Sequence, residues 1–131
     1  LLQYYEFYRI KDVQNDSISM QNFAKIFVSY INIYKNKMIK EKIANKEYKL
    51  DGEITFNEFI SFFWFVNEFS ELKEKLKNKS FSKEEFTNFA NEKLLNFPDN
   101  NKRTKINSKI VDLVYDILDK DSKLIINQLF R

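Results

Sequence analysis

A short pattern of apolar and polar positions recurs four times along the chain. Each copy begins with an apolar residue, has Ser or Thr next in three of the four cases, and ends with phenylalanine. The copies are ISMQNF (18–23), ITFNEF (54–59), FSKEEF (81–86) and IINQLF (125–130). The copies start 36, 27 and 44 residues apart, around the length of a helix–loop–helix unit. The pattern therefore predicts four similar units, each placing a phenylalanine one turn into a helix.

Each part of the repeat has a physical role. The leading apolar residue suits a very short strand that pairs with a neighbouring loop, and the hydroxyl residue suits the N-terminus of the helix that follows. A polar side chain three residues later completes a capping box. The predicted caps are the full boxes Ser82 with Glu85 and Thr55 with Glu58, and the looser pair Ser19 with Asn22.

The segments between the copies have helical periodicity. Apolar residues recur at intervals of three and four in 23–30 and again in 110–118, whereas 96–103, which contains Pro98, interrupts the pattern and predicts a loop. Alternation of the kind found in strands is missing over any useful length. The predicted fold is all-α: helix–loop–helix units of the EF-hand type, in two pairs, with very short strands between the loops.

The pattern also divides the chain. We assign residues 1–70 to a first pair of EF-hand-like units and residues 71–131 to a second pair whose last helix is truncated. The chain begins at Leu1 rather than methionine, and we expect it to be a piece of a longer protein.

The helix predicted over 56–69 is unusually aromatic. Its polar stripe is expected to consist of Asn57, Glu58, Ser61 and Glu68, and its core face of Phe59, Ile60, Phe62, Phe63 and Val66. Trp64 and Phe65 border the polar stripe, which makes them candidate partner-binding residues. The alternative is that other helices of the same lobe cover them.

Composition limits the chemistry. Hydrophobic residues make up 44% and aromatic residues 17% of the chain, enough for a packed core. Cysteine and histidine are absent, so any metal site must use oxygen ligands, and neither a nucleophile–base pair nor a phosphate-binding glycine loop is found. We therefore expect no enzyme.

The net charge is +3, with Lys and Glu interspersed, which indicates a solvated surface rather than a nucleic-acid interface. No apolar run is long enough to span a membrane.

Gly52 is the only glycine, and it predicts a turn at positive φ that no other residue can make. Its surroundings, LDGEITFNEF (50–59), resemble the second half of an EF-hand loop, in which glycine is the sixth residue and a bidentate glutamate the twelfth. With Gly52 as the sixth residue, the predicted loop runs from Glu47 to Glu58. The candidate calcium ligands are Glu47, Asp51, Glu53, Thr55 and Glu58. Lys49 occupies the third position, which removes one oxygen and adds a positive charge, so any calcium binding is expected to be weak.

The other three loops are less suited to calcium. The first, Lys11 to Asn22, and the third, Glu74 to Glu85, place lysine or an apolar residue at ligand positions. The fourth begins with Asp119 and Asp121 but lacks the glycine, is one residue short, and has Leu129 where the glutamate belongs. Asp119 and Asp121 are therefore interpreted as a relic of a calcium site.

Three long stretches, 5–30, 50–76 and 108–130, resemble the C-terminal half of the mitochondrial calcium uptake proteins. That family consists of EF-hand regulators of the calcium uniporter in the mitochondrial intermembrane space. Members keep one calcium loop upstream of the part seen here and one at the C-terminal end. The C-terminal loop would correspond to the segment that starts at Asp119, which has lost its glycine and glutamate.

The resemblance implies a degenerate EF-hand regulatory protein in the mitochondrion, acting through contacts with a protein partner or a homologous EF-hand subunit. The alternative is a calcium-independent structural or light-chain-like scaffold subunit of a larger complex. Nucleic acid is not expected as a partner.

Overall fold

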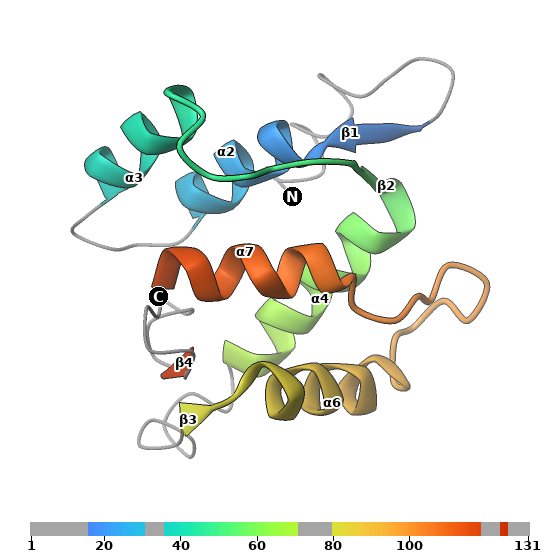
Figure 1. Ribbon diagram of the computed structural model, residues 1–131. Helices are drawn as coiled ribbons and strands as arrows, with labels where there is room; N and C mark the ends of the chain where they lie inside the picture. Colours follow the sequence, from blue (N-terminus) through green and yellow to red (C-terminus); the bar gives the residue numbers. More distant parts are fainter. Residues whose placement is uncertain (1–15, 31–35, 71–79, 119–123, 126–131) are drawn as a thin grey trace. The chain divides into compact units, whose positions relative to one another are not determined.

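The computed structural model describes residues 16–30, 36–70, 80–118 and 124–125. Five helices and four short strands lie in this part of the chain (Figure 1). They are β1 (Ser17–Ser19), α2 (Met20–Tyr30), α3 (Asn36–Ala44), β2 (Glu53–Thr55), α4 (Phe56–Ser70), β3 (Ser80–Phe81), α6 (Lys83–Leu94), α7 (Ser108–Leu118) and β4 (Leu124–Ile125). The predicted all-α, EF-hand-like fold with very short strands is confirmed.

The strands pair as the repeat requires. β1 pairs antiparallel with β2, and Ile18 of the first copy lies opposite Ile54 of the second. β3 pairs in the same way with β4, with Phe81 opposite Leu124. The sequence pattern starts the fourth copy at Ile125, so Ile125 is the residue expected opposite Phe81. In the structure Leu124, one residue earlier, takes that place.

The chain divides into two compact units, residues 1–56 and 57–131. α4 belongs almost entirely to the second unit, although its residues were predicted to belong to the first pair of repeats. Its side chains pack against α6, as the aromatic contacts below show. The boundary between repeat pairs after residue 70 stays a prediction, because compact units and repeat pairs are different divisions of the chain.

Aromatic rings from three helices form the core of the second unit. Phe65 of α4 meets Phe86 of α6 edge to face, with ring centroids 5.8 Å apart, and Phe86 in turn meets Tyr115 of α7 at 6.0 Å. The Tyr115 hydroxyl is shared between the carbonyl oxygens of Phe81 and Ser82, at 2.6 and 2.9 Å. The predicted core face of α4 is confirmed: Phe59, Ile60, Phe62, Phe63 and Val66 are all buried.

The first unit has its own core and polar link. Phe23 and Phe27 of α2 are fully buried, and Ile39 and Ile43 of α3 are buried as well. The side-chain amide of Gln21 donates to the carbonyl oxygen of Ile43 at 2.6 Å, which joins α2 to the C-terminal end of α3.

Two of the three predicted helix caps are present. The Ser82 hydroxyl accepts from the Glu85 backbone N–H, and the Glu85 carboxylate accepts from the Ser82 N–H, both at 3.1 Å. The Ser19 hydroxyl accepts from the Asn22 backbone N–H at 3.1 Å. The box predicted for Thr55 and Glu58 stays a prediction.

Candidate functional site

The loop around Gly52 is held to the first loop by paired backbone bonds. Gly52 has φ 92°, and its carbonyl oxygen accepts from the Met20 N–H at 2.9 Å. The reciprocal bond runs from the Phe56 N–H to the carbonyl oxygen of Asp16 at 3.1 Å. Asp16, with φ 48°, is the sixth residue of the first loop just as Gly52 is the sixth of the second. The two loops are therefore joined symmetrically, although only one retains glycine.

The positive φ expected at Gly52 is confirmed, but the expectation that only glycine could make such a turn is wrong. Asp16 and Lys46 also have positive φ, at 48° and 58°. Aspartate visits the left-handed region more readily than most residues because its short polar side chain can bond locally.

Most of the candidate calcium ligands lie exposed on the loop. Glu47, Asp51, Glu53 and Thr55 all have exposed side chains, and so has Lys49. The Glu53 carboxylate accepts a hydrogen bond from the hydroxyl of buried Ser17 at 3.2 Å, across the β1–β2 pair.

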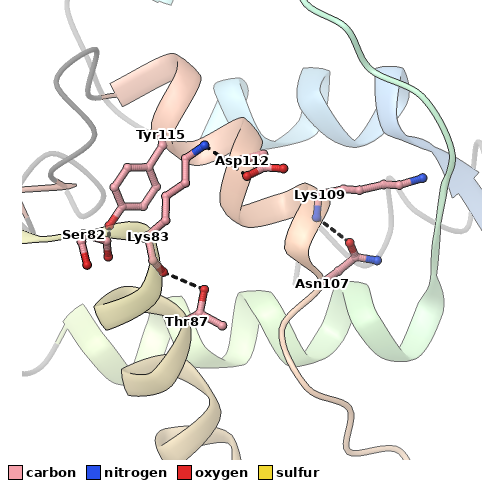
Figure 2. Close-up of polar contacts among 7 residues, drawn as sticks. All are labelled: Ser82, Lys83, Thr87, Asn107, Lys109, Asp112 and Tyr115. Atoms are coloured by element: carbon pink, nitrogen blue, oxygen red, sulfur yellow. Dashed lines mark hydrogen bonds and ion pairs between the residues drawn. The ribbon is translucent and has the colours of Figure 1, made fainter.

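Glu58, the residue expected to bind calcium with both oxygens, has a different partner. Its Oε2 accepts a hydrogen bond of 2.7 Å from the side-chain amide of Asn107. Asn107 is also the N-cap of α7, since its Oδ1 accepts from the Lys109 N–H at 2.8 Å (Figure 2). The Glu58 carboxylate thus lies in the first turn of α4 and beside the first turn of α7. Both helix termini favour a negative charge.

Sequence reasoning missed Asn107. Asparagine directly before an apolar-periodic helix is a recognisable N-cap signal, so this half of its role could have been found. Its bond to Glu58 spans 49 residues and depends on how α4 and α7 pack, which no local pattern encodes.

The described residues show no clear acidic cluster for a calcium ion. No three acidic side chains among them gather closely enough to hold a metal. Calcium needs six to eight oxygens, and the twelfth-position glutamate is the ligand that supplies two of them. Here that glutamate is bound to an amide instead. Asp119 and Asp121 lie outside the described residues.

The candidate partner-binding residues on α4 are covered to different degrees. Phe65 is 0% exposed, and its ring contacts Phe86 and Phe89 of α6. Trp64 is half-buried and meets Phe97 edge to face at 5.4 Å. The Phe65 ring is thus covered by another helix of the same lobe, which is the alternative that the sequence left open. A partner would reach Phe65 only if α6 moved. Partner binding at this surface stays a prediction.

The polar stripe predicted on α4 is partly buried as well. Ser61 is buried, and its hydroxyl oxygen accepts from the Thr104 hydroxyl at 3.3 Å. The loop between α6 and α7 therefore packs on a side chain of the predicted polar stripe. In the part of the chain that the structure describes, no helix combines the length and apolar character needed to cross a bilayer.

Paired loops, an αL residue at the sixth position of each, and a short two-stranded connection define an EF-hand-like protein. Among solved structures, the chain is similar to EFHA2 in its apo state, with a TM-score of 0.61 and 26% sequence identity. The match covers 97% of this chain and 41% of EFHA2, so the chain spans less than half of that neighbour. The sequence matches no protein-family model, and no curated protein was found as a relative.

Proposed function

We propose that this protein is a degenerate EF-hand regulator that acts through protein–protein contacts, with weak or no calcium binding in the segment described. We further propose that it works in the mitochondrial intermembrane space, on the calcium uniporter or on a related EF-hand subunit. It is not proposed to be an enzyme.

One observation supports the proposal most directly. The loops keep the paired backbone geometry of EF-hands, while the Glu58 carboxylate is bound to the Asn107 amide at 2.7 Å. A fold that keeps this geometry after its ligand set has changed suits binding between proteins better than calcium sensing.

The likeness to EFHA2 supports the mitochondrial part of the proposal. EFHA2 is EF-hand domain family member 2 and is in the MICU family. That is the family of mitochondrial calcium uptake proteins which the sequence resembles. Since the match covers 41% of EFHA2, we propose, on the strength of this likeness, that the chain shares the activity of the whole family member.

Calorimetric titration with calcium tests the state of the Gly52 loop. We expect no saturable heat at micromolar calcium. A micromolar site that disappears in Glu58→Ala and survives in Glu68→Ala would contradict the proposal, because Glu68 lies on the same helix outside the loop.

Calcium uptake by mitochondria separates regulation from the alternative scaffold function. Cells lacking the protein should take up calcium into mitochondria at an altered calcium threshold, and re-expression should restore the threshold. Unchanged uptake, together with loss of a complex that contains the protein, would instead favour the calcium-independent structural or light-chain-like subunit.

A further inference from the structure

A groove in the second unit lies outside the loop just described. It is formed by the C-terminal half of α6 and by the loop that leads to α7, with a volume of about 510 Å³. That volume falls within the range of about 300–1,000 Å³ typical of binding pockets. Its lining includes Asn91, Glu92, Leu95, Arg103 and Lys105.

The walls of the groove are fixed by hydrogen bonds. The Arg103 guanidinium donates to the Leu95 carbonyl oxygen at 3.1 Å, at the C-terminal end of α6. The Asn91 side-chain oxygen accepts from the Ile106 N–H at 2.8 Å. Because these bonds tie the loop to α6 at two places, the groove is formed before any partner arrives, and less ordering entropy is lost on binding.

The groove combines an apolar patch with positive charge. Leu95 is 64% exposed, and it is the large hydrophobic side chain that stands out as exposed among the described residues. Arg103 and Lys105 contribute two cations against the single carboxylate of Glu92. In the described part of the chain neither cation has a carboxylate partner. Arg103 has five N–H groups, so after its bond to Leu95 it still has donors that can hold a carboxylate.

We propose that this groove binds an acidic peptide segment that carries an apolar anchor residue. The anchor would pack on Leu95, and the flanking carboxylates would pair with Arg103 and Lys105. A membrane surface fits less well, because the Glu92 carboxylate interrupts the positive charge of the groove. This inference rests on the proposed function in one respect, namely that the protein binds a protein partner. It adds where on the protein that partner binds and which chemistry the partner carries.

The test uses a fluorescein-labelled synthetic peptide in which glutamates surround a central pair of leucines. Fluorescence anisotropy should show saturable binding to the whole chain. Leu95→Ser and Lys105→Glu should each weaken the affinity about 10-fold, the size expected for losing one anchor or charge contact. Lys109→Glu is the matched control, because this exposed lysine on α7 does not line the groove. Its affinity for the peptide should stay within about 2-fold of that of the unchanged protein, a difference of about 0.4 kcal/mol.

Altered peptides and lipid vesicles complete the test. A peptide with serines in place of the leucines, or glutamines in place of the glutamates, should bind poorly. The inference is overturned if binding is not saturable, if Leu95→Ser and Lys105→Glu bind like the unchanged chain, or if Lys109→Glu weakens binding equally. It is also overturned if vesicles of anionic phospholipid bind with the same residue dependence, which would assign the groove to a lipid surface. Circular dichroism confirms that each variant is folded, and failure here leaves the calcium-uptake test of the proposed function unaffected.

Discussion

At the scale of single residues, the turn that ends α3 places a lysine in a backbone conformation that usually belongs to glycine. The Lys46 N–H donates to the Ile43 carbonyl at 3.0 Å, and the Glu47 N–H donates to the Lys42 carbonyl at 2.9 Å. These two bonds form a Schellman motif, in which the residue at Lys46 must be left-handed and is most often glycine. Lys46 adopts φ 58° and carries that steric cost.

Lys46→Gly should therefore raise the free energy of unfolding by about 0.5–1 kcal/mol, because relief of the left-handed strain exceeds the added entropy of the unfolded chain. Urea unfolding followed by circular dichroism measures the change. The matched control is Lys40→Gly, at an exposed position inside α3, which should lower stability by about 1 kcal/mol. Equal losses in both variants would contradict the strain at Lys46.

Asn107 performs two separable tasks, capping α7 and bonding Glu58 of α4. Asn107→Ser keeps a cap oxygen but removes the amide donor, and should cost about 1 kcal/mol for a half-buried, charge-assisted bond. Asn107→Ala loses the cap as well and should cost about 1 kcal/mol more. Thermal unfolding of the two variants checks this order. If Asn107→Ser were as stable as the unchanged protein, the bond to Glu58 would contribute nothing to the fold.

At the scale of elements, local chemistry determines where helices begin. α6 starts after a full capping box, with Ser82 and Glu85 each satisfying the other's backbone N–H. The Tyr115 hydroxyl of α7 donates to the carbonyl oxygens of Phe81 and Ser82, so α7 is attached at the same point. Figure 2 shows Tyr115 beside Ser82. The start of α6 is thereby the junction of a strand and two helices.

Ser82→Ala should lower the free energy of unfolding by about 1 kcal/mol, the usual effect of losing an N-cap hydroxyl. Thr87→Ala on the same helix is the control. The Thr87 hydroxyl donates to the Lys83 carbonyl inside the helix, and its replacement by a better helix former should change stability by less than about 0.5 kcal/mol. Chemical denaturation of both variants decides the matter, and an unaffected Ser82→Ala protein would show that Tyr115 alone holds the junction.

The elements also show what the sequence could predict. Short-range signals identified the Ser82 cap, the helices over 56–69 and 110–118, and the core face of α4, because capping and periodicity act within one or two turns. The covering of Phe65 by α6, and of Ser61 by Thr104, depended on packing between segments distant in sequence. For the same reason the Glu47–Glu58 loop was predicted from its residues, whereas the bond from Glu58 to Asn107 was not.

At the scale of the whole molecule, the described part of the chain keeps the pairing of EF-hand loops, while the glutamate expected to bind calcium has a partner within the chain. The two loops are joined by the Gly52–Met20 and Asp16–Phe56 backbone bonds, and the second loop ends at a glutamate bound to Asn107. Proteins that depend on a metal for folding gain most of their stability from that metal. This chain should instead be folded in the presence of a chelator.

A thermal unfolding series in calcium measures how far that independence extends. A site with a Kd of about 1 mM would add only about 1.4 kcal/mol at 10 mM calcium, whereas a site of about 1 μM would add more than about 5 kcal/mol. We expect a gain no larger than the first value, with magnesium at equal ionic strength as the control for screening. Glu58→Gln keeps the size of the side chain and removes its charge, so it should abolish any calcium-specific part of the gain. A gain near the larger value would mean that calcium displaces Asn107 from Glu58 and that the loop is a working site after all.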